Sequence, residues 1–524
     1  MPVSEEMPVG SGRLPARSVV ESLRHAVSDA PDRTAIIYRG RILSYAEYGR
    51  SVAGLAERLR RVRGTDGPVA IVMPNSPEMS IATFAAWVAG AQVALLNPNY
   101  TARELRPLLA GAGPSAVVTL HTSREVPERL AAELGVPVVS LDAGGASLEK
   151  WLRDETLVIG DEDLPEPASL ATLMYTGGTT GIPKGVNHTH RSLVLTVRGM
   201  EACWPTRLGE EVWLNVAPCF HIWGLLMGIL NPVYGQATLV TAPGFVPEKV
   251  VSALHSHAVT VFGGGPAEIY GGLLSATNIT ESDLSSLRVC PGGGSRFSAA
   301  LHQRWFAATG AVIYEAFGMT ELAPISCNPS GLPPRAGSVG LPAPLVEIEV
   351  VRLSDGDDRA LPVGEVGEIR VWAPHLTVGY SDREPESTHQ LQAPEWLRTG
   401  DIGHLDEDGY LYIVDRKKDM IIVGGFNVYP REIDEILTSH KGVVDAATVG
   451  VASDRKGERP VSFVVPAASS SIGADELLSY CAKNLTKYKC PSEIVIVDQL
   501  PRTAANKVDR KALRAVAGAR AQAQ

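Results

Sequence analysis

The sequence has 524 residues, of which 45% are hydrophobic and 20% are charged. This length exceeds one ordinary domain, and the composition is typical of a soluble globular protein. The formal net charge of −10 argues against a general nucleic-acid or anionic-membrane binder, because such binding needs clustered positive charge. The most apolar stretch, residues 222–230, stops at Asn231-Pro232 and is far shorter than a membrane span of ~20 residues.

Two features indicate a cytoplasmic protein. The first residues, MPVSEEMPVGSG, lack the basic start and the apolar run of a signal peptide. The six cysteines show no CxxC spacing and are too few in a chain of this length for a disulfide framework. We therefore expect reduced cysteines and a cytoplasmic location.

Strands and helices alternate in the first part of the chain. Strands are predicted at residues 69–73, 92–97 and 115–120, with helices at 78–91 and after Thr101, which has capping-box spacing to Glu104. This alternation predicts an α/β fold with largely parallel sheets.

The same pattern resumes beyond residue 180. Three strands that each end in glycine or a turn are predicted within residues 259–265, 287–294 and 311–318. Ligand sites in such sheets gather at the carboxyl ends of the strands, so we expect functional residues in the loops that follow.

The pattern of predicted strands and helices changes from about residue 409. Short strands around a charged turn, an amphipathic helix and further strands predict a compact unit of roughly a hundred residues. We predict a large N-terminal domain of layered α/β sheets over residues 1–414 and a hinge at 415–419. A small α+β C-terminal domain is predicted over residues 420–524.

The strongest single motif is YTGGTTGIPKGV at residues 175–186. Its glycines and threonines, together with Lys184, suit a loop that lays backbone N–H groups, hydroxyls and one positive charge along a polyphosphate. A flexible glycine turn is the alternative interpretation. A Walker A loop is excluded, because Gly185 follows the lysine where that motif has Ser or Thr.

This loop resembles the signature of the adenylate-forming superfamily, which includes acyl- and aryl-CoA synthetases, peptide-synthetase adenylation domains and firefly-type luciferases. The resemblance covers nearly the whole chain, because further motifs of that superfamily follow in order. They are APCFHIWG (217–224), PGGGS (291–295), YEAFGMTE (314–321), GSVGLP (337–342), RTGD (398–401), DRKKDMIIVGGFNVYPREID (415–434) and PRTAANK (501–507).

The resemblance implies an ATP/AMP site. An aromatic ring can stack on adenine and a hydroxyl can hold a phosphate; Phe317 stands where the superfamily usually has tyrosine, so stacking is expected without the hydroxyl contact. Asp401 and Arg416 are expected at the ribose. The implied nucleotide-binding residues are Thr176, Gly177, Gly178, Thr179, Thr180, Lys184, Gly292, Gly293, Gly294, Glu315, Ala316, Phe317, Gly318, Met319, Thr320, Asp401, Arg416 and Lys507.

The resemblance also implies a Mg²⁺ site, in which Glu321 and Thr180 are the expected ligands. The HxH pairs at 188/190 and 255/257 would need a third ligand before they indicated a metal.

Lys507 is implied as the catalytic residue that neutralises charge on the α-phosphoryl group during adenylation. Asn506 stands before it where the family commonly has glycine. Lys418 matches the pivot of the small domain. Rotation about it is implied to withdraw Lys507 and to bring Gly424 and Gly425 to the coenzyme A tunnel.

The acid pocket is implied at APCFHIWG and at two glycine-rich strand ends. His221 matches a histidine that faces the carboxylate, although a lone histidine in an apolar stretch is more often a core residue. The motif holds no acidic residue to pair with an α-ammonium, so an acid without an α-amine is expected. Three consecutive glycines either admit a bulky acid or only shape a turn. The pocket residues are His221, Trp223, Gly263, Gly264, Gly265 and Ser295.

These features together predict an ATP-dependent acid:thiol ligase that uses ATP, Mg²⁺ and coenzyme A and acts on a small-molecule carboxylic acid. Loading of a separate carrier protein, a luciferase-type oxygenase and a non-catalytic adenylate-binding homologue are the alternatives. No nucleic-acid partner and no membrane span are expected, and a homodimer is possible.

Overall fold

A computed structural model describes residues 16–141, 146–176, 184–242, 244–295, 297–353, 358–381, 396–423, 426–453, 457–467, 470, 472–503 and 508–523. The chain forms two compact units, one of residues 1–347 and 372–395 and one of residues 348–371 and 396–524. None of the described helices has both the length and the apolar character that a membrane span requires.

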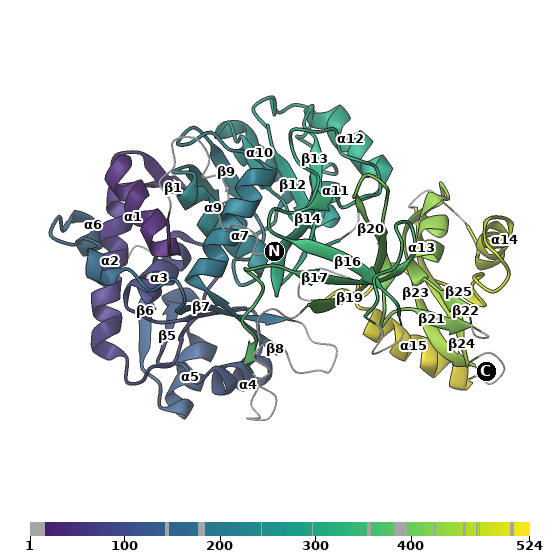
Figure 1. Ribbon diagram of the computed structural model, residues 1–524, viewed down its shortest axis with the longest axis horizontal. Helices are drawn as coiled ribbons and strands as arrows, with labels where there is room; N and C mark the ends of the chain where they lie inside the picture. Colours follow the sequence, from purple (N-terminus) through teal and green to yellow (C-terminus); the bar gives the residue numbers. More distant parts are fainter. Residues whose placement is uncertain are drawn as a thin grey trace. The chain divides into compact units, whose positions relative to one another are not determined.

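The first unit contains a seven-stranded sheet (Figure 1). In spatial order its strands are β18 (Tyr380–Ser381), β8 (Lys184–Thr189), β7 (Leu170–Thr176), β4 (Val93–Leu96), β3 (Val69–Val72), β5 (Ala116–Leu120) and β6 (Val138–Leu141). The strands from β7 to β6 run parallel, whereas β8 pairs antiparallel with β7 and β18 pairs antiparallel with β8. Strands β3 and β4 are buried at every position, as in a parallel sheet covered on both faces. The predicted parallel α/β layering is confirmed.

Helices cover this sheet. α3 (Pro77–Val88) is buried throughout, because it packs against β3, β4 and the neighbouring helix α2 (Tyr45–Val62). α4 (Ala102–Ala112) begins with the predicted capping box, in which the backbone N–H of Thr101 donates to Glu104 Oε2 at 2.9 Å. The other helices in this part of the unit are α1 (Val19–Asp29), α5 (Glu125–Leu134), α6 (Ala146–Arg153) and the 3₁₀ turns His121–Ser123 and Asp161–Asp163.

Two smaller sheets complete the first unit. One has the order β11 (Val261–Gly263), β9 (Val212–Asn215), β10 (Thr238–Thr241), β1 (Thr34–Tyr38) and β2 (Arg41–Ser44). The other has the order β12 (Cys290–Gly293), β13 (Ile313–Met319), β14 (Leu322–Cys327) and β15 (Leu341–Pro342). A buried aromatic group of Phe262, Tyr270, Phe297 and Trp305 packs beside β11 and β12 and fixes the strand ends that carry the glycines.

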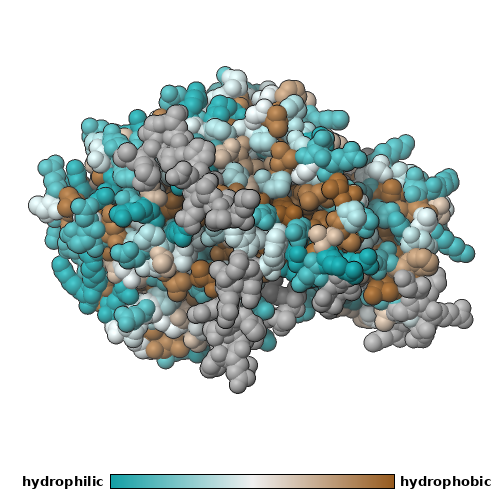
Figure 2. Space-filling view, in the orientation of Figure 1, coloured by the Kyte–Doolittle hydropathy of each residue, from teal (hydrophilic) through white to brown (hydrophobic). Residues whose placement is uncertain are grey.

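The helices around these sheets follow the strands closely. They are α7 (His190–Cys203), α8 (Ile222–Leu225), the π-helix Leu226–Leu230, α9 (Asn231–Tyr234), α10 (Pro247–Ser256), α11 (Ala267–Leu273) and α12 (Ala299–Thr309). On the face drawn in Figure 2, the region of α2 and α6 is predominantly hydrophilic, which agrees with the exposed side chains of Glu57, Arg61, Lys150 and Arg153.

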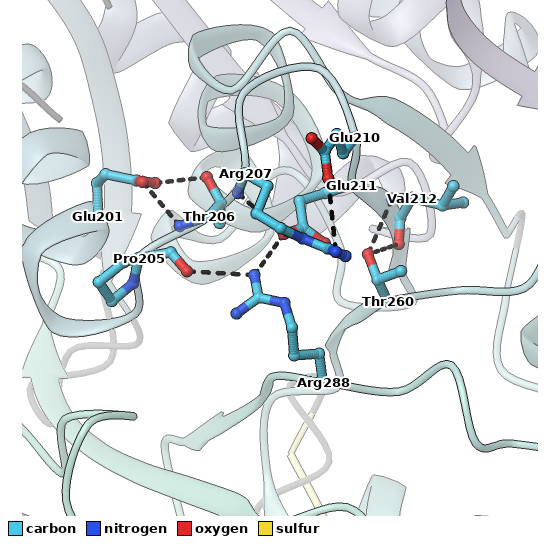
Figure 3. A network of polar contacts seen from close by, with 9 residues as sticks. All are labelled: Glu201, Pro205, Thr206, Arg207, Glu210, Glu211, Val212, Thr260 and Arg288. Carbon is cyan, nitrogen blue, oxygen red and sulfur yellow. Dashed lines mark hydrogen bonds and ion pairs between the residues drawn. The ribbon is translucent and has the colours of Figure 1, made fainter. Parts of the chain in front are cut away.

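A polar network joins the segment after α7 to Arg288, in the segment that leads into β12 (Figure 3). The buried carboxylate of Glu211 accepts hydrogen bonds from the backbone N–H of Arg207 at 2.9 Å and from its side chain at 3.2 Å, and it pairs with Arg288. Burial alone would raise the pKa of Glu211, but hydrogen bonds from Thr260 and Arg207 and the charge of Arg288 lower it. This network therefore fixes the start of β9 against the segment that leads into β12.

Cys203 and Cys327 form a disulfide between the end of α7 and the end of β14. The expectation of reduced cysteines is wrong for this pair. The two residues are 124 positions apart, and no local spacing indicates that the fold brings them together.

The second unit contains two sheets. One has the order β16 (Glu347–Val351), β17 (Gly367–Trp372), β19 (Leu397–Leu405) and β20 (Leu411–Arg416). In the other, β22 (Phe426–Val428), β21 (Ile421–Val423), β24 (Gly457–Pro466) and β23 (Val443–Ser453) are joined by β25 (Glu493–Ile496). The helices are α13 (Pro430–Ser439), α14 (Ala474–Asn484) and α15 (Arg510–Ala523).

Helices cover both faces of the second of these sheets. Leu437 of α13 and Leu477 of α14 belong to one apolar cluster, and Leu513 of α15 belongs to another. The compact unit begins at Ile348, upstream of the predicted boundary, because β20 pairs with β19 and so joins the preceding strands to it. The division at 1–414, 415–419 and 420–524 concerns motion about a hinge and stays a prediction.

Candidate active site

The predicted phosphate loop connects β7 and β8. Its two described ends, Thr176 and Lys184, face each other in the antiparallel hairpin, and the Thr176 hydroxyl lies 3.5 Å from the Lys184 carbonyl oxygen. The exposed Lys184 ammonium lies 5.4 Å from the centre of the Tyr380 ring. The predicted residues Gly177, Gly178, Thr179 and Thr180 lie outside the described residues.

Strands β12 and β13 bring two predicted nucleotide segments together. Gly292 pairs with Glu315 and Gly293 with Ala316 in a parallel register. Both glycines are required by packing, because a Cβ on Gly292 would lie 2.4 Å from Phe297 Cζ and one on Gly293 would lie 2.8 Å from the Ala316 carbonyl oxygen. Gly294 has a φ of +88°, which favours glycine.

The nucleotide motif continues to the turn between β13 and β14. Phe317 is half-buried, Gly318 is exposed, and Met319 pairs with Leu322 across the turn. The carboxylate of Glu315 accepts a hydrogen bond from His302 Nε2 at 2.8 Å. Sequence reasoning missed His302, since it lies in α12 outside any motif.

Glu321 follows this turn and is only 7% exposed. Its Oε1 accepts a hydrogen bond from the Tyr380 hydroxyl at 2.9 Å, and its backbone carbonyl accepts one from the Thr377 N–H at 2.9 Å. Sequence reasoning missed both partners, because they lie more than fifty residues downstream.

The neighbouring Thr320 is held by a buried histidine. His188 Nε2 lies 2.7 Å from the Thr320 carbonyl oxygen. Burial lowers the pKa of His188 to about 4, so the ring is neutral near pH 7. Because a carbonyl only accepts, Nε2 carries the proton and donates it.

The described residues could hold Mg²⁺ only together with phosphate groups of a bound nucleotide. No group of three or more His, Cys, Asp or Glu side chains that could hold a metal occurs among them. One buried carboxylate, Glu321, nevertheless matches the usual Mg²⁺ site of one or two carboxylates completed by substrate phosphates and water. The HxH pair at 188/190 has another role, because His188 binds the Thr320 carbonyl.

The predicted acid-binding motif ends in the short helix α8. His221 is its N-cap, and its backbone N–H donates to the Pro218 carbonyl at 3.0 Å. Gly224 allows this close turn, since a Cβ there would lie 2.0 Å from the Pro218 carbonyl oxygen. The indole of Trp223 packs edge to face against Trp204, with ring centres 6.4 Å apart. The Trp223 Nε1 is buried and has no hydrogen-bond partner in the described part of the chain.

Side chains of the protein pack closely against two of the three glycines at the end of β11. A Cβ on Gly263 would lie 2.8 Å from Met227 Cβ, and one on Gly264 would lie 2.6 Å from the Phe262 ring. A Cβ on Gly265 would lie 3.4 Å from Trp223 Nε1. The packing at Gly263 and Gly264 supports a role in shaping the strand end. The expectation that the three glycines admit a bulky acid stays a prediction.

Ser295 is engaged within the protein. Its hydroxyl accepts from the backbone N–H of Ala267 at 2.9 Å and donates to Glu268 Oε2 at 2.9 Å. Glu268, on α11, is a second carboxylate beside the predicted pocket that sequence reasoning missed.

The second unit carries the predicted ribose contacts. Asp401 on β19 pairs in register with Arg416 on β20, and Arg416 Nε lies 3.2 Å from Asp401 Oδ1. Lys418 follows in the next turn, where burial and then the charge of Arg416 lower its pKa. Gly424, Gly425 and Lys507 lie outside the described residues.

Comparison with known proteins identifies the family. Residues 23–381 match the AMP-binding enzyme family, and residues 432–507 match the AMP-binding enzyme C-terminal domain. The chain therefore belongs to the AMP-binding enzyme family. The resemblance to acyl- and aryl-CoA synthetases, the predicted fold class and the assignment to this class of ligases are confirmed.

Individual relatives match along most of their length. A long-chain-fatty-acid–CoA ligase of Salmonella typhimurium is 33% identical, with 95% of this chain and 94% of the relative covered. A feruloyl-CoA synthase of Amycolatopsis is 35% identical, with 91% and 95% covered. The crystal structure of ATP-bound MatB from Rhodopseudomonas palustris superposes with a TM-score of 0.87 at 29% identity, with 95% and 98% covered.

Proposed function

We propose that the protein converts a carboxylic acid without an α-amine into its acyl-AMP and then into its coenzyme A thioester. The observation that carries this proposal is the buried carboxylate of Glu321, held beside Thr320 and linked through Tyr380 to Lys184 of the phosphate loop. The curated relatives are named as coenzyme A ligases of a fatty acid and of ferulate, which supports coenzyme A as the acceptor.

In the first half-reaction a carboxylate oxygen of the acid attacks the α-phosphorus of ATP. The bond between this phosphorus and the bridging oxygen breaks, and pyrophosphate leaves with the electron pair. Lys184 would balance the charge of the polyphosphate, and Lys507 would balance the charge that builds on the α-phosphoryl group. A Mg²⁺ ion on Glu321 and Thr180 would supply charge neutralisation for the phosphates.

In the second half-reaction the thiolate of coenzyme A attacks the acyl carbonyl carbon. The acyl–oxygen bond to AMP breaks, and AMP leaves as the phosphate anion, so the thiol proton is the only proton released. Rotation about Lys418 would remove Lys507 and place Gly424 and Gly425 along the path of the thiol.

We further propose that the acid is aromatic and carries a hydrogen-bond acceptor away from its carboxylate. The paired rings of Trp204 and Trp223 offer an aromatic contact. The buried Trp223 N–H has no partner in the described residues, and such a donor binds best to an acceptor on the ligand. The close packing against Gly263 and Gly264 argues against a large polycyclic acid.

Pyrophosphate release and product mass should be measured with hydroxycinnamic, benzoic, fatty and polycyclic acids, with and without coenzyme A. We expect acid-dependent pyrophosphate release, a coenzyme A thioester and a preference for substituted aryl acids. Trp223→Phe keeps a ring but loses the N–H. The ratio of kcat/KM for hydroxylated over unsubstituted aryl acids should therefore fall by about tenfold.

The alternatives give different results. Acyl-AMP that reacts only with a carrier-bound thiol would replace coenzyme A as the acceptor. Absence of pyrophosphate release across the whole panel would favour a non-catalytic adenylate-binding protein. A homodimer and a cytoplasmic location are further predictions, which sedimentation and cell fractionation would test.

A further inference from the structure

A short segment that ends in β18 connects the candidate metal ligand to the strand of the phosphate loop. We propose that Tyr380 of this segment is the positioning residue that orients Glu321 toward Mg²⁺ on the ATP phosphates. The inference rests on the proposed function, because it assumes that ATP binds between Lys184 and Glu321.

The hydroxyl of Tyr380 holds one oxygen of the carboxylate. It donates to Glu321 Oε1 at 2.9 Å, and the carboxylate is largely buried. A hydrogen bond to a charged acceptor fixes the carboxylate plane more firmly than a neutral pair does. A carboxylate held in one orientation suits the strict octahedral geometry that Mg²⁺ demands.

The backbone of Glu321 is held by the same segment. The Thr377 N–H donates to the Glu321 carbonyl at 2.9 Å, while the Thr377 hydroxyl donates to the Asn187 carbonyl at 2.7 Å. Asn187 lies on β8, the strand that begins with the phosphate-loop lysine. Both the backbone and the side chain of Glu321 are thus tied to that strand.

Tyr380 also contacts the other charge of the proposed site. β18 pairs with β8, with Tyr380 opposite Val186. The Lys184 ammonium lies 5.4 Å from the centre of the Tyr380 ring, within the range of a cation–π contact. One phenol therefore touches the lysine through its ring and the carboxylate through its hydroxyl, and it sets the spacing between a phosphate-binding cation and a metal-binding anion.

Tyr380→Phe separates these two contacts, because it removes the hydroxyl and keeps the ring. Binding of Mn²⁺ to the full-length protein with a non-hydrolysable ATP analogue should be followed by electron paramagnetic resonance. We expect about tenfold weaker Mn²⁺ binding, since loss of a partner of a metal ligand typically costs 10- to 100-fold. Metal-free binding of the analogue should change by less than about twofold, because the cation–π contact of Lys184 persists.

Tyr412→Phe is the matched control. Its hydroxyl donates to Asp406 Oδ2 at 3.2 Å in the second unit, so the same atom is lost from the same kind of pair outside the proposed site. Mn²⁺ binding should not change in this variant. Tyr380→Leu also removes the ring and should weaken metal-free binding of the analogue.

Two results would overturn the proposal. The first is an equal Mn²⁺ affinity in the wild type and in Tyr380→Phe. The second is that Tyr380→Phe weakens binding of the ATP analogue equally with and without metal. Failure of the proposed function would look different. In that case the wild type would bind Mn²⁺ and the analogue normally but would release no pyrophosphate with any acid.

Discussion

The two units hold their candidate nucleotide residues in very different ways. In the first unit Glu321 is 7% exposed and is held through both its side chain and its backbone by Tyr380 and Thr377. In the second unit Asp401 pairs with Arg416, whose side chain is 52% exposed. Buried groups with several partners keep one geometry, whereas a half-exposed ion pair contributes little and rearranges easily. The comparison indicates that Glu321 is held in one geometry, whereas the side chain of Arg416 can rearrange.

The largest effect on catalysis should come from substitution of Lys507 in the second unit. Lys507→Ala should slow acyl-AMP formation by about 100-fold or more, because it removes a charge that stabilises the transition state. Thioester formation from supplied acyl-AMP should be unaffected if this unit serves the two half-reactions with different residues. Single-turnover measurements of each half-reaction would test this. Equal loss in both would contradict the proposed hinge at Lys418.

The buried histidines of the first unit allow its stability to be tested by changing the pH. Burial lowers the pKa of His188 to about 4, and burial with the charge of His188 lowers that of His375 to about 4. Between pH ~6.5 and 4 the unfolded chain binds more protons at these rings than the folded protein does. The free energy of unfolding of the first unit should therefore fall as the pH drops through this window.

Each of these histidines should lower the free energy of unfolding by about 2 kcal/mol as the pH falls from 6.5 to 5. His188→Gln keeps a donor for the Thr320 carbonyl but cannot titrate, so urea unfolding of this variant should depend less on pH. The exposed His255 on α10 provides a matched control, because His255→Gln makes the same substitution at a solvent-facing position. An equal change in both variants would refute burial as the cause.

The strands, several helices and the order of the motifs were predictable because each depends on residues close in sequence. The capping box at Thr101 is an example, since its partner Glu104 lies only three residues away. The partners of Glu321 were not predictable. Tyr380 and Thr377 carry no local signal, and they reach Glu321 only because β18 pairs with β8.

Two features that the sequence left unresolved have the same origin. The glycines at 263 to 265 were open to two interpretations, and Met227, which packs against Gly263, comes from another part of the chain. The disulfide between Cys203 and Cys327 likewise depends on α7 ending beside β14. Sequence reasoning indicated which residues are special but not what the fold places against them.

The smallest effect should come from loss of the ion pair between Asp401 and Arg416. Arg416→Ala should lower the stability of the second unit by less than about 1 kcal/mol, because half-exposed ion pairs contribute little. The KM for ATP should rise a few-fold with kcat unchanged, as for a contact made equally in the ground and transition states. Arg370→Ala is the control: Arg370 binds Glu349 at 2.9 Å in the same sheet and is only 14% exposed. It should cost more stability and leave the KM for ATP unchanged, and the opposite ranking would mean that Arg416 has a structural role.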